Sequence, residues 1–179
     1  MRPLLPLFCF ITLSLTAQST SVPRVHEIGV RMSGLDDFDL MYKKSLDDAA
    51  TYRRYRLFFS ELSYLNVDGT SVGTLNVGAS IGRERRSAVT DRLQFNRGPE
   101  LFASLQYLGV DGESQLTLSP GVGYVLGLQY NLSDEFYLGI ETIPSVSLRV
   151  GVGEPTIVGF NAGFNSSALS VLAMYRFSR

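Results

Sequence analysis

The chain has 179 residues, with 16 Lys and Arg against 17 Asp and Glu, and a formal net charge of −1. This balance offers no excess of positive charge to a polyanion, so nucleic acid is not an expected partner. One cysteine and one histidine provide neither a disulfide framework nor a metal site that needs two imidazoles, and no cofactor motif is recognised.

The N-terminal segment has the organisation of a secretory signal peptide. A short basic start precedes the apolar run from Leu4 to Leu15, which is too short to span a bilayer. Ala17 is the last small residue before a polar stretch, so residues 1–17 are predicted to be removed. The mature part, residues 18–179, is expected to form one domain without a thiol, because Cys9 lies in the removed segment.

Apolar residues then alternate with small or polar ones at every second position, which predicts strands. In the first segment Ile28, Val30 and Met32 share one face, while Glu27 and Arg31 share the other. Turn residues rich in Gly, Asp, Asn and Ser separate the segments. Eight strands are predicted, at residues 25–33, 36–44, 52–66, 73–86, 91–108, 115–131, 135–150 and 157–178.

Two charge-free stretches, Ser114–Ser133 and Pro155–Tyr175, have the length of membrane-spanning helices. Their alternate Gly, Asn, Ser and Gln residues, with Pro120 inside the first, disfavour helices. A soluble sandwich also alternates apolar and polar positions, but here the polar face consists of small residues and isolated charges. The predicted fold is therefore all-β, an eight-stranded antiparallel transmembrane up-and-down β-barrel that follows a cleaved signal peptide.

The predicted topology also sorts the charges. An even strand number places both chain ends on one side, which is the periplasmic side in bacterial single-chain barrels. The outward ends then carry acidic residues: Asp36, Asp37, Asp68, Asp111, Glu113 and Glu154. The periplasmic ends carry basic ones: Arg24, Lys43, Lys44, Arg53, Arg54, Arg83, Arg85, Arg86, Arg92, Arg176 and Arg179.

Three segments resemble a known family. They are Ala17-Gln18, the run from Ser119-Pro120-Gly121 through Gln129-Tyr130-Asn131 to Gly139, and the end Ala173-Met174-Tyr175-Arg176-Phe177. The chain is similar here to the small bacterial outer-membrane β-barrel proteins that include OmpX and the membrane domain of OmpA. The resemblance implies a location in the bacterial outer membrane. It also implies that Tyr175 and Phe177 act as a C-terminal signal for the barrel assembly machinery, although two residues follow Phe177.

Candidate sites outside the barrel interior favour structural interpretations. His26 begins a strand, and no partner for a catalytic site accompanies it. The Asp36-Asp37-Phe38-Asp39 cluster lacks the Gly and distal Glu of a calcium loop and is interpreted as a solvated turn. Gly121-Val122-Gly123 is interpreted as packing inside a narrow barrel and Gly151-Val152-Gly153 as a turn, because no helix follows either. The basic run Arg83–Arg86 is interpreted as a solvated periplasmic end, with lipid headgroups or a wall polymer as alternatives.

The inward face carries the most organised set of residues. The predicted register places nine charged side chains in the lumen: Glu27, Arg31, Arg54, Arg56, Glu84, Glu100, Glu141, Arg149 and Arg176. An eight-stranded barrel is narrow enough for side chains to fill, and isolated charges inside it would be costly, so a paired plug is expected. Arg97 falls on the lipid face, which requires either a bulge near Gly98-Pro99 or an arginine that reaches the headgroups.

The sequence therefore favours a structural or interaction barrel that is not an enzyme and has no large pore. Its expected partners are outer-membrane lipids and the assembly machinery, and it is expected to be monomeric. Two alternatives remain open at this point: a lipid-modifying barrel enzyme, and a soluble lipocalin-like ligand carrier. A carrier would stay in the soluble fraction, whereas a barrel would need detergent.

Overall fold

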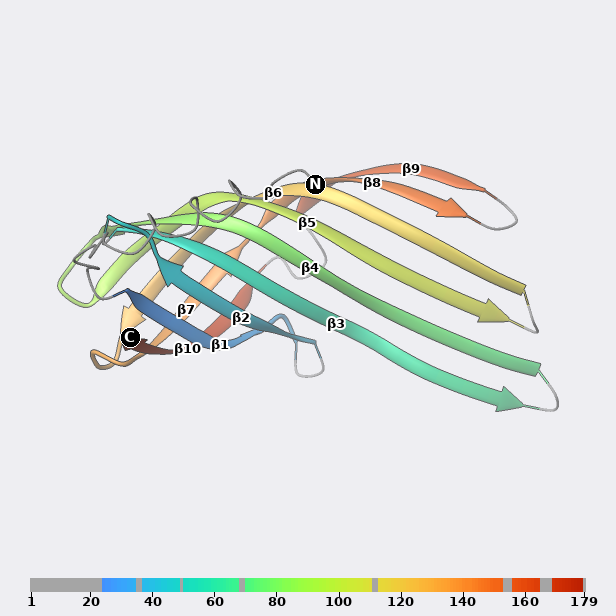
Figure 1. Ribbon diagram of the computed structural model, residues 1–179, viewed down its shortest axis with the longest axis horizontal. Coiled ribbons are helices and arrows are strands. Elements are labelled where there is room, and N and C mark those ends of the chain that lie inside the picture. Colours follow the sequence, from blue (N-terminus) through green and yellow to red (C-terminus); the bar gives the residue numbers. More distant parts are fainter. Residues whose placement is uncertain are drawn as a thin grey trace, which may run out of the picture.

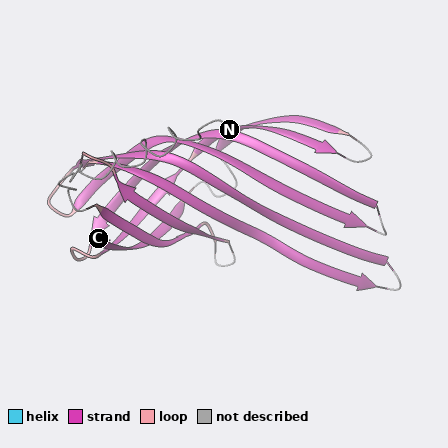
Figure 2. Ribbon diagram, in the orientation of Figure 1, coloured by secondary structure: helices cyan, strands magenta, loops and turns pink. Residues whose placement is uncertain are grey.

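The computed structural model describes residues 24–34, 37–48, 50–67, 70–110, 113–152, 156–164 and 169–178, and its regular structure consists of strands (Figure 2). In the described part of the chain, no helix has the length and apolar character needed to span a membrane. The predicted signal peptide, with Cys9, lies outside the described residues. The strands are β1 (Val25–Met32), β2 (Phe38–Ser45), β3 (Thr51–Val67), β4 (Thr70–Ala88), β5 (Leu93–Val110), β6 (Glu113–Asn131), β7 (Phe136–Thr142), β8 (Pro144–Val152), β9 (Ile157–Phe164) and β10 (Ser170–Ser178).

These strands form one antiparallel sheet that closes into a ring of eight. Each of β1 to β5 pairs with the strand that follows it in the chain. The ring is completed by the pairings of β6 with β7, β7 with β10, and β10 with β1. The predicted seventh and eighth strands are each present in two segments: β7 is followed by β8, and β9 is followed by β10. Ile143 separates β7 from β8, and both segments pair with β6. The predicted fold class and strand number are confirmed.

The sheet continues beyond the ring at the end away from the C-terminus. Strands β3 to β6 are 17 to 19 residues long, whereas β1 and β2 have eight residues each. Figure 1 shows β3, β4, β5 and β6 running side by side well past β1 and β2. The pairing of β2 with β3 ends at Phe38 and Phe59, next to a register shift in the β3–β4 ladder between Phe59 and Glu61. The result is a closed barrel with a protruding sheet.

The outer face of the ring is apolar, as the alternation predicts. Leu57 is 61% exposed, Leu101 59% and Ile28 55%, and in each case the neighbours along the strand turn inward. Large apolar side chains so exposed on every strand of the ring would be unfavourable in water, and they suit a hydrocarbon environment. This face is the lipid-facing surface of the barrel.

Glycines make room for aromatic rings inside the ring. A Cβ atom built on Gly121 would lie 2.3 Å from the Phe102 ring, and one on Gly78 would lie 2.1 Å from the Phe58 ring. Small residues on the inner face therefore allow large ones from neighbouring strands to fill the lumen. The packing interpretation of Gly121-Val122-Gly123 is confirmed.

Candidate functional site

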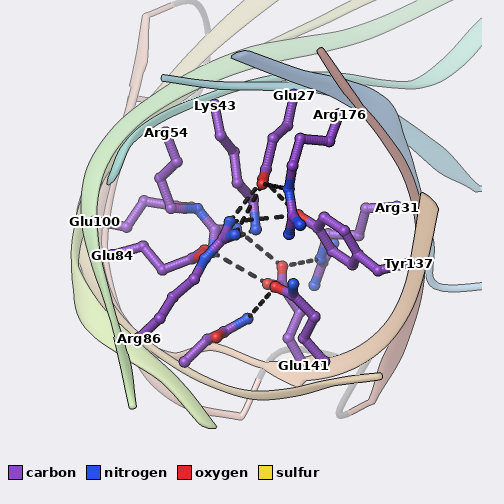
Figure 3. A network of polar contacts seen from close by, with 12 residues as sticks. Glu27, Arg31, Lys43, Arg54, Glu84, Arg86, Glu100, Tyr137, Glu141 and Arg176 are labelled. Atoms are coloured by element: carbon purple, nitrogen blue, oxygen red, sulfur yellow. Dashed lines mark hydrogen bonds and ion pairs between the residues drawn. The ribbon is translucent and has the colours of Figure 1, made fainter. Parts of the chain in front are cut away.

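The interior of the ring holds a set of charged side chains that come from most of its strands. Because strand residues alternate between faces, each strand of the ring except β6 delivers one or two of them to the lumen. Their carboxylates are Glu27, Asp39, Glu84, Glu100 and Glu141, and their cations are Arg31, Lys43, Arg54, Arg56, Arg86 and Arg176. In Figure 3 the labelled members of this set point from the wall toward a common centre. We call these eleven residues the lumen network.

Arg54 on β3 is the hub of the lumen network. Its guanidinium binds Glu141 through two bonds, Nη1 to Oε2 at 3.1 Å and Nη2 to Oε1 at 2.9 Å. Nη1 also lies 3.3 Å from Glu84 Oε2. Nε lies 3.0 Å from Glu100 Oε2, where it forms an ion pair without being aligned for a hydrogen bond. The planar five-donor fork of arginine suits such a site, since it meets several carboxylates at once.

Glu84 on β4 connects the hub to a buried lysine. Lys43 Nζ donates to Glu84 Oε2 at 2.7 Å, and Arg86 Nε donates to Oε1 at 2.9 Å. The Lys43 and Glu84 side chains are 1% and 0% exposed. Among the described residues, Glu84 is the only carboxylate that pairs with Lys43. An ammonium group removed from water in this way depends on its single partner.

Glu27 on β1 accepts hydrogen bonds from side chains on three other strands. Arg86 binds it through two bonds of 2.8 and 2.6 Å, Tyr137 OH donates to Oε2 at 2.7 Å, and Arg176 Nε donates to Oε1 at 3.1 Å. The Arg86 guanidinium also lies 3.6 Å above the centre of the Tyr52 ring. Hydrogen bonds and the aromatic face together satisfy an arginine that has left water.

The other end of the lumen network is formed by Asp39. Its Oδ2 accepts from Arg31 Nη1 at 2.8 Å and from Arg56 Nη1 at 2.9 Å. Arg31 Nε pairs with Glu141 at 2.8 Å, and Arg56 Nη2 with Glu100 at 2.6 Å, so the same chain of contacts returns to Arg54. A cavity of about 210 Å³ lies against this end of the lumen network. Its walls include Arg31, Asp39 and Arg56.

No protein-family model and no curated protein matches this chain. Among solved structures, a major outer membrane protein from Thermus thermophilus is similar over 86% of this chain and 99% of that one, with 12% identity and a TM-score of 0.54. This similarity decides the fold. The chain is an outer-membrane-type β-barrel.

Two further solved structures are similar to this barrel. Ail of Yersinia pestis, the attachment invasion locus protein, covers 87% of this chain and 98% of its own, with 13% identity and a TM-score of 0.49. Neisserial surface protein A covers 88% and 95%, with 12% identity and a TM-score of 0.41.

The barrel brings together eight of the nine predicted lumen residues: Glu27, Arg31, Arg54, Arg56, Glu84, Glu100, Glu141 and Arg176. Arg149 is the exception. It lies on β8, beyond the closed ring, where its side chain is exposed and forms no ion pair with a described residue. Its face was predicted correctly, but at that height the sheet is open and no opposite wall supplies a carboxylate.

Four residues of the site were not predicted to belong to the lumen network or to contact it. Lys43 and Arg86 were predicted at solvated periplasmic ends, and Asp39 was predicted in a solvated turn, yet all three are buried in the lumen. Tyr137, to which no role was assigned, is buried there as well. The available signal was strand alternation, because Arg86 shares the parity of Glu84.

The remaining candidates lie on other surfaces. His26 Nδ1 is 2.6 Å from Tyr42 OH, and its ring stacks on Phe177 at 5.5 Å. Phe177 in turn stacks on Tyr175 at 6.4 Å. Asp36 lies outside the described residues, and within the described ranges no three His, Cys, Asp or Glu side chains are placed to hold a metal ion. Arg97 keeps its outward position, because the β4–β5 register does not shift between Gly82–Glu100 and Arg85–Arg97.

Proposed function

We propose that this chain is a non-enzymatic structural or interaction barrel of the bacterial outer membrane whose lumen network closes the interior to solutes. One observation carries the proposal: a continuous chain of ion pairs runs from Arg176 through Glu27, Arg86 and Glu84 to Arg54, and on through Glu141 and Arg31 to Asp39. Its groups come from opposite walls and meet in the middle (Figure 3). An ion crossing the barrel would have to break these contacts inside a low-dielectric wall.

The placement of the single histidine supports a role without catalysis. His26 lies on the first strand, engaged by Tyr42 and stacked on Phe177, and not among the lumen carboxylates. Those carboxylates are in turn held by arginine and lysine. A side chain fixed by two or three charge-assisted bonds is suited to holding strands together more than to exchanging protons with a substrate.

The outer surface supports residence in a bilayer. Apolar side chains on the outward face, such as Ile28, Leu57 and Leu101, are more than half exposed. Lipid is the partner that this face fits. We propose further that the barrel is a monomer and that Tyr175 and Phe177 form the recognition signal for the assembly machinery.

Conductance in planar bilayers tests the closed lumen. The wild-type barrel is expected to give steady conductance near background. Glu141→Ala removes both bonds to Arg54 and the contact with Arg31, so it should lower thermal stability and admit an intermittent leak. Tyr124→Ala, on the outer face, is the control and should be milder because it unpairs no charge.

Large and long-lived channels in the wild-type protein would contradict the proposal. So would a Glu141→Ala variant that is neutral in both conductance and thermal stability. Either result would make transport of solutes the leading function.

A further inference from the structure

A second set of basic residues lies on the outside of the barrel, near the end that carries the C-terminus. Five of them occupy four adjacent strands: Lys44 on β2, Arg53 on β3, Arg83 and Arg85 on β4, and Arg97 on β5. They are direct neighbours across the sheet, because Lys44 pairs with Arg53, Arg53 with Arg83, and Arg85 with Arg97. We call these five residues the basic band.

The basic band belongs to the lipid-facing surface. Arg53 shares its face with Tyr55 and Leu57, and Arg83 shares its face with Ile81, all of which are more than one third exposed. Arg85 lies three residues before the end of β4 and Arg97 four residues after the start of β5. At about 3.3 Å per residue and a strand tilt near 40°, both lie roughly 8–10 Å above the strand ends. Each headgroup layer of a bilayer is about 5–8 Å thick, so long arginine side chains at this level can reach the headgroups.

The basic band has no ion-pair partner among the residues that the structure describes. Among the described residues, none of its members forms an ion pair or a side-chain hydrogen bond, in contrast to Arg86, which turns inward to Glu27 and Glu84. Like charges directly opposite each other on neighbouring strands are destabilising. The chain as a whole carries a net charge of −1, so the local concentration does not reflect a general excess of positive charge. The arrangement calls for an external anion.

The band also contains a groove of about 530 Å³. Its lining includes Arg83, Arg85 and Arg97, with Pro99 and Tyr124 beside them. The lining contains one carboxylate, Asp48, which accepts a hydrogen bond of 2.8 Å from Thr51 and forms no ion pair with a described residue. One carboxylate against three guanidinium groups leaves the groove positively charged. Arginine forks bind phosphate oxygens in pairs, and Tyr124 presents an aromatic ring where the acyl chains of a lipid would begin.

We propose that this groove binds the phosphate group of an anionic phospholipid in the periplasmic leaflet. The proposal rests on the outer-membrane residence proposed above, which orients this end toward the periplasm. A cell-wall polymer in the periplasm would meet the turns at the periplasmic end of the barrel. The basic band instead lies on the same outer face as the apolar side chains that contact lipid. A headgroup bound there keeps its acyl chains against Leu57, Ile81 and Leu101, so charge and apolar contact favour the same ligand.

Tryptophan quenching tests the proposal, since the chain contains no tryptophan. A Tyr124→Trp reporter barrel is placed in phosphatidylcholine vesicles that contain a few per cent of brominated lipid, either phosphatidylglycerol or phosphatidylcholine. We expect brominated phosphatidylglycerol to quench more than its share of the bilayer, and brominated phosphatidylcholine to quench in proportion to its share. At about fivefold per arginine, Arg85→Gln with Arg97→Gln should reduce the preference for the anionic lipid by roughly 25-fold.

The matched control removes the same charge elsewhere. Arg92→Gln with Arg149→Gln, in a turn and on the protruding sheet, should leave the preference unchanged. Equal quenching by the two lipids in the reporter barrel would overturn the lipid site while leaving the proposed function intact. An unchanged preference in the Arg85→Gln, Arg97→Gln variant would also overturn it. The absence of quenching by both lipids would overturn the bilayer placement, and the lipid site with it.

Discussion

Glu84→Gln tests whether the charges inside the barrel depend on one another as the contacts indicate. Glu84 pairs with Lys43, Arg54 and Arg86. After the substitution Arg54 keeps Glu100 and Glu141, and Arg86 keeps Glu27. Lys43 keeps no carboxylate among the described residues, and its side chain is 1% exposed. Leaving a buried charge without its partner costs about 3–5 kcal/mol.

The same reasoning ranks two further substitutions. Glu141→Gln should cost less, about 1–3 kcal/mol, because Arg31 keeps Asp39 and Arg54 keeps Glu84 and Glu100. Adding Lys43→Met to Glu84→Gln should recover most of the loss, since it removes the stranded ammonium and replaces a buried pair by groups that need no counter-charge.

Reversible urea unfolding in detergent micelles, followed by far-ultraviolet circular dichroism, measures these free energies. Glu135→Gln, in an exposed turn, is the matched control and should leave the unfolding midpoint unchanged. A Glu84→Gln variant that is no more destabilised than Glu141→Gln would contradict the dependence of Lys43 on Glu84. So would a Lys43→Met substitution that recovers nothing in the Glu84→Gln background.

Three further outcomes are expected. Gly121→Ala should destabilise the barrel by about 1–3 kcal/mol because its Cβ would lie 2.3 Å from Phe102, whereas Gly73→Ala, with 3.9 Å to its nearest neighbour, should not; the temperature at which unboiled protein loses its folded gel mobility measures both. Phe177→Ala should reduce assembly in cells while the purified chain still folds in detergent, and normal assembly would refute a signal at this residue. The intact mass of membrane-extracted protein should correspond to a chain that begins at Gln18, and a mass that retains residues 1–17 would refute the signal peptide.

The strands of this fold could be predicted from the sequence because one face of each is apolar. Alternation alone locates Ile28 and Leu101 on the lipid side and Glu27 and Glu141 on the inner side. It also places Arg149 on the correct face. A period of two residues gives the face of a side chain but not its height in the barrel, and for that reason the exposure of Arg149 could not be predicted.

The height of a residue depends on the stagger between strands, which is a property of the closed ring. Arg86 lies two residues before the end of β4, and its partner Glu27 lies two residues after the start of β1, so both are near the same end of the ring. Both are nevertheless buried, because the closed ring surrounds them at this height. Position along the strand therefore suggested a solvated end for Arg86 and for Lys43. The break at Ile143 was likewise not predicted, although Thr142-Ile143-Pro144 interrupts the alternation there and a proline inside a strand signals a break.

The ion pairs of the interior join parts of the chain that are far apart in sequence. Glu27 contacts Arg86, Tyr137 and Arg176 at separations of 59, 110 and 149 residues. The contact with Arg176 cannot form until the first strand meets the last, and the lumen that surrounds these charges stays open to water until that moment. Expulsion of this water and closure of the ring are then a single late event, and such non-local pairing is intrinsically slow. The polar interior thus sets the order of folding: an apolar exterior can enter the bilayer strand by strand, but the lumen becomes dry only when the last strand is in place.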